Sequence, residues 1–293
     1  MDKMFKLPVV VGFDASRSSK EALRWAAGDA ERRRVPLSIV HAVFTPLDYG
    51  PGLSYTESDM GRLEAEGAEL LSAAKQMVLE TSPDLEVTTE LVREPRTPAL
   101  INRSKDARLI VIGSRELGAV GRGLLGSVGS SLARHAHCPV AIVHFRASDP
   151  WHLSRPRKAV VVGVDGSDNS IPAIEIAFEE ASMRAAKVIA VHSWTDDSKF
   201  LHVGDWDAVA TKEEALLSAS LAGSAGRYPD VTVEKIVVKN DPVRHLLDFS
   251  DDVELLVVGS HGRGGFAGMT LGSVSQKLLH SAKCPLIIAA GPA

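Results

Sequence analysis

The chain of 293 residues contains one pattern twice, and this internal duplication constrains the fold more than any other feature of the sequence. The segment from Gly113 to Pro139 aligns without a gap with the segment from Gly259 to Pro285, and eleven of the 27 aligned positions are identical. Near the start of each copy, the run Val-Val-Val-Gly-Phe-Asp ends at Asp14 and the run Val-Val-Val-Gly-Val-Asp ends at Asp165. A chain that repeats itself in this way is expected to fold as two similar domains.

The spacing between the copies locates the equivalent residues. They are 151 positions apart in the first part of each copy, as for His41 and His192, and 146 apart from the glycine-rich stretch onward. The second copy is therefore shorter by five residues, a loss that is placed most simply around residues 46–55. Copies of about 145 residues match the usual size of a domain. We predict a first domain over residues 1–147, a linker over 148–156 and a second domain over 157–293.

Composition narrows the class of protein. The chain is 45% hydrophobic and 24% charged, as is typical of soluble globular proteins. Its net charge is −4 with no basic block, which gives nucleic acid binding little electrostatic support. No apolar run reaches membrane-spanning length, and the N-terminus lacks a signal-peptide core. We therefore expect a cytoplasmic protein with no nucleic acid partner and no membrane span.

Two cysteines, Cys138 and Cys284, stand at equivalent positions before a proline. A duplicated Cys-Pro pair fits a small buried residue at the entry to a strand better than a disulfide or a nucleophile.

Each copy contains five short, almost continuously apolar segments, which is typical of strands buried on both faces of a parallel sheet. The expected strands are 9–13, 37–43, 87–92, 109–112 and 140–145, then 159–164, 188–194, 231–238, 255–258 and 286–289. Helical patterns separate them, and the run from Ser18 to Glu21 is interpreted as a capping box that opens the first helix. Each copy thus predicts a doubly wound α/β domain with a five-stranded parallel sheet, of the Rossmann-like class.

Repeated residues follow three strands of each copy, and these indicate a ligand site. In an open α/β sheet, ligands bind beyond the carboxyl ends of the strands, where the winding reverses. Asp14 and Asp165 close the first strand, and Ala42 and Ser193 follow the histidine of the second strand. Each aspartate could accept a hydrogen bond from an exocyclic amine or a ribose hydroxyl, or could merely cap the first helix. The two roles are compatible.

The glycine-rich stretch after the fourth strand leads into a helix. Gly113 and Gly259 lack a Cβ and would let a ligand approach the backbone. The runs Gly126-Ser127-Val128 and Gly272-Ser273-Val274 open the helix, where a hydroxyl and free N–H groups would converge on an anion. A Gly-Ser pair before a helix is also an ordinary N-cap. Its place after a buried strand and its repetition favour the anion site.

Other chemistries lack their residue patterns. The chain has no G-x-x-x-x-G-K-[ST] loop, and neither first-strand turn carries G-x-G-x-x-G. No Ser-His-Asp order, histidine-rich metal motif or pair of carboxylates stands out. His41 and His192 are interpreted as structural residues. We predict no catalytic residue and no metal ligand.

The pattern G-x2-G-x9-G-[ST] after a fourth strand, with Val-Val-Gly-x-Asp-x-Ser at the start, resembles the universal stress protein family. The resemblance covers nearly the whole chain as two tandem domains, and the run from His135 to Pro139 is similar to tandem members of actinobacterial type. The second copy carries the full motif, whereas Glu116 replaces the second glycine in the first.

The resemblance implies the strand order 3-2-1-4-5 and one ATP site in each domain, with or without Mg²⁺. In the ATP-binding branch of the family, the first-strand aspartate and the backbone after the second strand hold adenine. The glycine after the fourth strand approaches the ribose and phosphates, and the Gly-Ser helix start binds phosphate oxygens. The site residues expected from the motif and its neighbours are Gly12, Asp14, Ala42, Gly113, Ser114, Arg115, Arg122, Gly126, Ser127 and Val128, then Gly163, Asp165, Ser193, Gly259, Ser260, His261, Gly262, Arg263, Gly272, Ser273 and Val274. The Arg and His side chains among them would either contact phosphate or remain solvated.

Glu116 makes the two predicted sites unequal. A carboxylate near a triphosphate is repulsive, and a residue other than glycine resists a positive φ. We therefore predict that the second site binds ATP at least as tightly as the first.

The function that follows is that of a regulatory ATP-binding protein in stress adaptation. Its protein partner is unidentified, and a homodimer is an open option. The alternatives are a slow ATPase or an adenylate-transferring enzyme, and a scaffold that binds no nucleotide. The first-strand turns lack the Ser-Gly-Gly-x-Asp-Ser loop of ATP pyrophosphatases, which disfavours the enzyme. The complete second motif disfavours the scaffold.

Overall fold

The computed structural model describes residues 7–44, 57–114, 127–144, 159–194, 206–263 and 271–290. The chain divides into two compact units, Met1–Phe145 and Arg146–Ala293. The predicted linker at 148–156 lies outside the described residues. No helix in the described ranges is long and apolar enough to cross a membrane.

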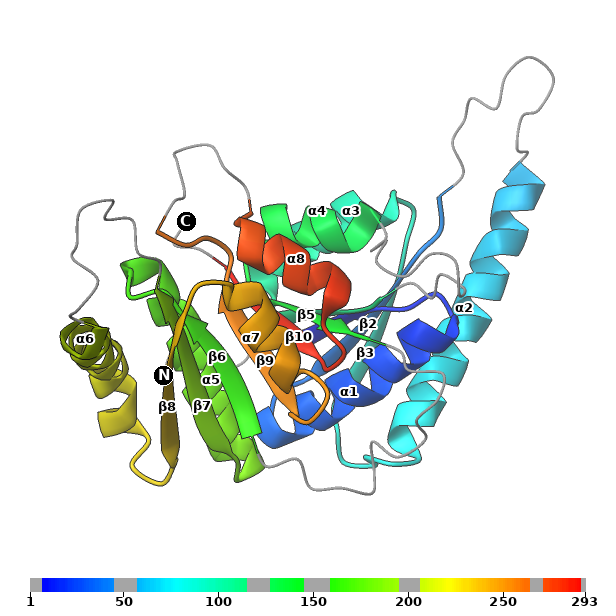
Figure 1. Ribbon diagram of the computed structural model, residues 1–293. Coiled ribbons are helices and arrows are strands. Elements are labelled where there is room, and N and C mark those ends of the chain that lie inside the picture. The colour runs from blue at the N-terminus through cyan, green and yellow to red at the C-terminus, as the bar shows by residue number, and fades with distance from the viewer. Residues whose placement is uncertain are drawn as a thin grey trace, which may run out of the picture. The chain divides into compact units, whose positions relative to one another are not determined.

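The first unit alternates strands and helices (Figure 1). Its elements are β1 (Val9–Gly12), α1 (Arg17–Arg33), β2 (Leu37–Ala42), α2 (Glu57–Leu79), β3 (Val87–Val92), α3 (Arg96–Arg103), β4 (Leu109–Gly113), α4 (Ser127–His135) and β5 (Val140–Val143). The strands are parallel and run in the order β3-β2-β1-β4-β5. Helices α1 and α2 pack together on one face of the sheet, and α3 and α4 on the other.

The second unit repeats this plan. Its elements are β6 (Ala159–Val164), α5 (Ile171–Arg184), β7 (Lys187–Trp194), α6 (Trp206–Arg227), β8 (Val233–Lys239), α7 (Pro242–Phe249), β9 (Leu255–Gly259), α8 (Ser273–Ser281) and β10 (Leu286–Ala289). Its strands are parallel in the order β8-β7-β6-β9-β10. The predicted class, a parallel α/β sheet in each of two tandem domains, is confirmed.

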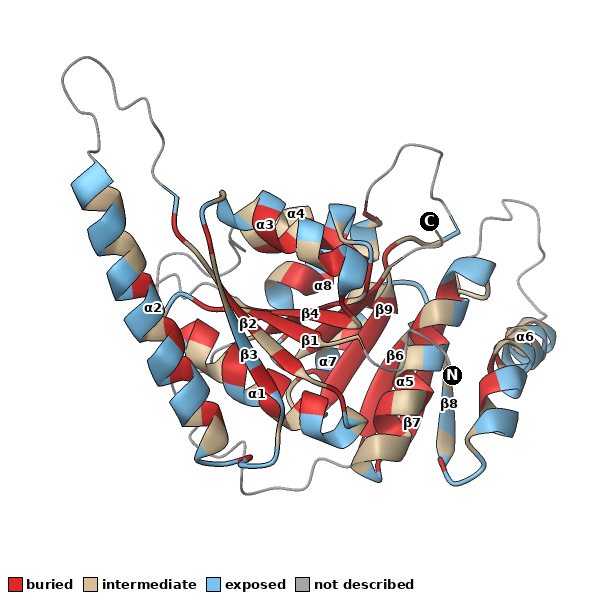
Figure 2. Cartoon of the chain, turned by 180° about the vertical axis from the view of Figure 1, so that it is seen from behind, coloured by how far each residue is buried: buried red, intermediate tan, exposed pale blue. Residues whose placement is uncertain are grey.

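The fourth and fifth strands of each unit are almost completely buried. Every residue of β4 before Gly113 and every residue of β5 is buried, as are the corresponding residues of β9 and β10 (Figure 2). The third strand of each unit differs, because β3 and β8 carry exposed residues. The prediction of burial on both faces is therefore wrong for these two strands.

Helix α1 begins earlier than the predicted capping box. Its N-cap is Ser16, whose Oγ accepts a hydrogen bond from the backbone N–H of Ser19 at 3.2 Å. Ser18 and Ser19 are instead buried within the first turn. The box was misplaced because Ser16 is held by the carboxylate of Asp14, a contact that the S-x-x-E pattern does not encode.

The two cysteines are buried and form no disulfide. Burial raises the pKa of the Cys138 thiol to about 12, so little nucleophilic thiolate forms at neutral pH. The interpretation as small buried residues is confirmed.

Candidate functional site

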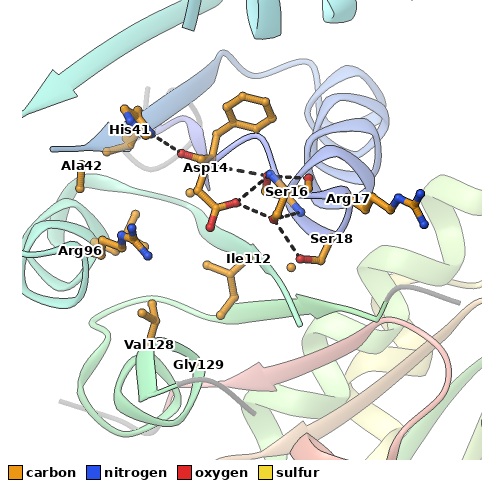
Figure 3. A pocket seen from close by; sticks show the side chains of 16 residues that line it. Asp14, Ser16, Arg17, Ser18, His41, Ala42, Arg96, Ile112, Val128 and Gly129 are labelled. Carbon is orange, nitrogen blue, oxygen red and sulfur yellow. Dashed lines mark hydrogen bonds between the residues drawn. The ribbon is translucent and has the colours of Figure 1, made fainter. Parts of the chain in front are cut away.

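Each unit has a cavity at the carboxyl ends of its strands. The cavity of the first unit has a volume of about 340 Å³ and lies between β1, β2, β4 and the starts of α1, α3 and α4 (Figure 3). The cavity of the second unit has a volume of about 290 Å³ and lies at the equivalent place. Most of the lining residues are equivalent under the repeat, so the duplication extends to the cavity walls.

The structure brings most of the predicted site residues to these walls. Those that line a cavity are Gly12, Asp14, Ala42, Gly113 and Val128, then Gly163, Asp165, Ser193, Gly259, His261, Gly262, Arg263, Gly272, Ser273 and Val274. Ser114 and Ser127 do not line the first cavity, and Ser260 is buried behind the second, with its Oγ 3.0 Å from Nδ1 of His261. Arg115, Arg122 and Gly126 lie outside the described residues. Nucleotide contact by any of them stays a prediction.

Asp14 shapes the turn between β1 and α1. Its Oδ1 accepts hydrogen bonds from the backbone N–H of Ser16 at 3.1 Å and from Oγ of Ser16 at 2.5 Å. Partial burial raises the pKa of Asp14, but the hydrogen bonds from Ser16 and the charge of Arg96 outweigh it, so the pKa lies below its ordinary value. Asp14 thus supports the N-cap residue Ser16 and is not itself the cap, which was one of the two roles expected for it.

Asp165 is held by more donors. Its Oδ1 accepts hydrogen bonds from the backbone N–H and Oγ of Ser167, at 2.9 and 2.7 Å, and from Oγ of Ser170 at 2.5 Å. Its Oδ2 accepts one from the backbone N–H of Arg263 at 2.6 Å. Burial raises the pKa of Asp165, but the hydrogen bonds from Ser170, Ser167 and Arg263 outweigh it and keep the pKa below its ordinary value. The start of the glycine-rich stretch of the second unit is therefore hydrogen-bonded to the aspartate.

Gly113 and Gly259 are required for a reason that the sequence did not show. A Cβ on Gly113 would lie 2.4 Å from the carbonyl O of Ser18, and a Cβ on Gly259 would lie 2.9 Å from that of Asn169. Ser18 and Asn169 are equivalent under the repeat. The missing Cβ thus lets the strand end approach the first helix of its own unit, whatever it also offers a ligand.

Gly262 has a different role. A Cβ at this position would lie 2.9 Å from Oδ2 of Asp165, while its φ is outside the left-handed region. Lack of space beside the Asp165 carboxylate, and not a positive φ, therefore disfavours other residues here. Glu116 is the equivalent residue in the first unit, where Asp14 stands in place of Asp165.

Helix α8 presents free donors to the second cavity. Its N-cap is Gly272, which has no capping side chain, and Ser273, Val274 and Ser275 line the cavity. Within the described residues, no group accepts from the backbone N–H of these three residues. Oγ of Ser275 donates to the carbonyl O of Gly259 at 2.6 Å. The helix start is thus held against β9 with its N–H groups available to an anion.

Sequence reasoning missed the contribution of α3 and α7. Arg96 extends from the first turn of α3 toward the carboxylate of Asp14 (Figure 3). Leu100 and its repeat equivalent Leu246 also line the cavities, and their Cδ1 atoms would lie 3.1 Å from a Cβ on Gly12 or Gly163. The 146-residue spacing could have identified the two leucines. It could not identify Arg96, because its equivalent is Pro242.

The repeated histidines hold strand ends. Nδ1 of His41 lies 2.7 Å from the carbonyl O of Phe13, and Nδ1 of His192 lies 2.8 Å from that of Val164. Each histidine thus links the second strand to the residue before the first-strand aspartate. These contacts support the structural interpretation of both residues.

Comparison with known proteins gives consistent matches. The model of the universal stress protein family matches residues 7–144 and 156–290. A universal stress protein of Mycobacterium tuberculosis is 43% identical over 286 residues, which are 96% of this chain and 96% of the relative. Another from the same organism is 42% identical over 291 residues, 97% of this chain and 96% of the relative. A universal stress protein structure from Archaeoglobus fulgidus has a TM-score of 0.70 at 18% identity and covers 96% of this chain and 98% of its own, which shows similarity of fold.

Proposed function

The chain belongs to the universal stress protein family, and from this premise we propose that it is a regulatory ATP-binding protein of stress adaptation with one nucleotide site in each domain. The observation that carries the proposal is the pair of equivalent cavities, each lined by the first-strand aspartate, the residue after the second-strand histidine and the glycine after the fourth strand. Their volumes of about 340 and 290 Å³ are close to the lower end of the range for small-molecule sites, roughly 300–1,000 Å³.

The proposed orientation of ATP follows from the chemistry of the walls. The base end lies beside Asp14 and Ala42 in the first domain and beside Asp165 and Ser193 in the second, where a carboxylate can accept from an amine or a hydroxyl. The phosphates lie toward the start of the fourth helix of each domain. In the second domain, the free N–H groups at the start of α8 and the guanidinium of Arg263 suit that charge.

Mg²⁺ would come with the nucleotide. The described part of the chain holds no cluster of three or more His, Cys, Asp or Glu side chains suited to a metal ion. Mg²⁺ is commonly bound through substrate phosphates and water with few protein ligands, so such a cluster is not required.

ATP acts in this proposal as a ligand that biases conformation or assembly, and no catalytic residue is assigned. The same proposal includes a protein partner that recognises the ATP-bound state, a homodimer and a cytoplasmic location. A slow ATPase or adenylate-transferring enzyme is the alternative, and a scaffold without nucleotide is the third.

The test is to identify and count the nucleotide bound to the full chain. The protein is titrated with ATP by calorimetry, and any nucleotide carried through purification is released by denaturation and identified by chromatography. We expect two ATP per chain, one after Asp14→Ala and one after Asp165→Ala, because each substitution removes the base-end acceptor of one site. No binding at either site contradicts the proposal and favours the scaffold. ADP formation that falls in each variant favours the enzyme.

A further inference from the structure

The second domain contains a buried histidine–carboxylate pair. His192 at the end of β7 is 0% exposed, and its Nε2 lies 2.8 Å from Oε2 of Glu213 on α6. The residue equivalent to Glu213 in the first domain is Gly67. There the helix packs directly on the imidazole, since a Cβ on Gly67 would lie 3.0 Å from Cδ2 of His41. The pair is therefore specific to the second domain.

The contacts of His192 determine how many protons the pair holds. Its Nδ1 lies 2.8 Å from the carbonyl O of Val164, and because a carbonyl oxygen only accepts, Nδ1 carries a proton. An ionised carboxylate also only accepts, so the contact between Nε2 and Glu213 needs one further proton. The pair is then either imidazolium with carboxylate or neutral imidazole with carboxylic acid. Removal of this shared proton would set a nitrogen lone pair against a carboxylate oxygen in a buried place.

The imidazole connects α6 to the ligand cavity. Val164, which accepts from His192, immediately precedes Asp165, and Ser193 immediately follows His192. Asp165 and Ser193 both line the second cavity. A shift of His192 would therefore move the ends of two strands that form the wall.

We propose that Glu213 is a positioning residue of the second nucleotide site, which acts through His192 and makes the affinity of that site depend on a proton shared by the two side chains. The first site lacks the carboxylate and so lacks this dependence. The inference rests on the proposed function for its ligand.

Other charged groups on the elements around His192 do not replace Glu213. Apart from Glu213, the charged residues of α5, of α6 from residue 208 onward, of β8 and of the end of β6 are Glu175, Glu179, Glu180, Arg184, Lys212, Glu214, Arg227, Glu234, Lys235, Lys239 and Asp165. Among the described residues, Glu213 alone forms an ion pair or side-chain hydrogen bond with the imidazole. Lys235 lies 3.8 Å from Glu214, and Lys239 lies over the ring of Trp194. Helix α7, with Arg244 and His245, packs on the opposite face of the sheet (Figure 1).

The decisive variant is Glu213→Gln. A glutamine N–H can donate to Nε2 of a neutral imidazole, so the variant keeps the hydrogen bond and its shape without the shared proton. Glu213→Gly copies the first domain at the same position. The chain with Glu213, Glu213→Gln and Glu213→Gly each also carry Asp14→Ala, so that only the second site is measured. A separate Asp165→Ala variant gives the pH profile of ATP binding to the first site.

The measurement is ATP affinity by calorimetry at a series of pH values from about pH 5 to about pH 9.5, so that the ordinary titration range of an imidazole is included. With Glu213, we expect the second site to weaken about tenfold relative to the first as the proton is lost, because two buried groups lose their hydrogen bond. With Glu213→Gln the ratio should stay constant, and with Glu213→Gly the second site should be weaker at every pH. His261 also lines this cavity and is present in all the variants, so it cannot account for a difference between them.

A second readout does not need the ligand. The backbone amide signal of Asp165 in an NMR titration should move with pH in the unmodified chain and stay in place in Glu213→Gln. The inference would be overturned if the unmodified chain and Glu213→Gln gave the same pH profile, either of ATP affinity or of the Asp165 amide signal. Absence of ATP binding in the unmodified chain would overturn the proposed function instead, while the Asp165 signal still decides the link between Glu213 and the site.

Discussion

The two cavities lie at equivalent places in two copies of one fold, yet the chain supports them differently. In the second domain the backbone N–H of Arg263 donates to Asp165, and Oγ of Ser275 donates to the carbonyl O of Gly259. In the first domain, Gly129 stands in place of Ser275, so the second of these bonds cannot form. The shared fold thus places the two cavities at equivalent positions, while single side chains determine which hydrogen bonds form in their walls.

Positive charge also reaches the two cavities from different elements. In the first, Arg17 on α1 and Arg96 on α3 line the cavity, and the charge of Arg96 helps to lower the pKa of Asp14. In the second, Pro242 replaces Arg96, and Arg263 lines the cavity. The copies therefore differ both in the chemistry of the walls and in the side from which a cation can approach the ligand.

The largest expected effect comes from copying the first site into the second. Gly262→Glu would set a Cβ 2.9 Å from Oδ2 of Asp165 and add a second carboxylate beside it. We expect the loop to lose its contact with Asp165 and the ATP affinity of the second site to fall at least about tenfold, as for a lost buried hydrogen bond. Calorimetry on the Asp14→Ala background measures this.

The matched control is Gly223→Glu, since Gly223 lies on α6 with nothing within 4 Å of an added Cβ. The same change there should leave the affinity as it was. The reverse change, Glu116→Gly, should strengthen the first site. If Gly262→Glu left the ATP affinity of the second site unchanged, Glu116 would not explain a difference in affinity between the two sites.

A smaller effect is expected at the first site alone. Arg96→Ala removes the cation that faces Asp14, and because Arg96 is exposed, we expect only about threefold weaker ATP binding there, less at high salt. Arg244→Ala on α7 is the control, since Arg244 is exposed and does not line the second cavity. Equal losses at both sites after Arg96→Ala would show that the arginine acts on the fold and not on its own cavity.

The smallest effect concerns stability in acid. Asp14 and Asp165 have lowered pKa values, so their stabilisation of the fold is complete above the ordinary aspartate pKa of about 3.9 and is lost as pH falls through the lower folded-state values. Asp165→Asn should flatten the fall in thermal midpoint between about pH 5 and about pH 2 more than Asp14→Asn, because Asp14 is more exposed. Solvent screening keeps each contribution below about 1 kcal/mol. If the thermal midpoint of either variant fell more steeply with decreasing pH than that of the unmodified chain, the aspartate would not contribute stability in the way expected from its lowered pKa.

Much of the site could be predicted because it follows from local order along the chain. Asp14 and Asp165 come at the end of a buried strand, and in a parallel sheet such ends meet at one edge. The reasons for particular residues were less accessible. Gly113 is needed beside Ser18 and Gly262 beside Asp165, and neither contact can be read from a glycine-rich spacing. Arg96 was missed because it is more than 80 positions from Asp14 in the sequence.

The duplication, the parallel α/β class and the edge of the sheet where the cavities lie could all be predicted from the residues alone, because apolar periodicity and the winding rule act over short stretches of chain. The contacts between distant side chains could not, and they are known only from the folded chain. The fold sets Arg96 against Asp14 in one domain and Glu213 against His192 in the other. Such contacts depend on how helices pack on a sheet, and one residue, as at Gly67 and Glu213, is enough to change them.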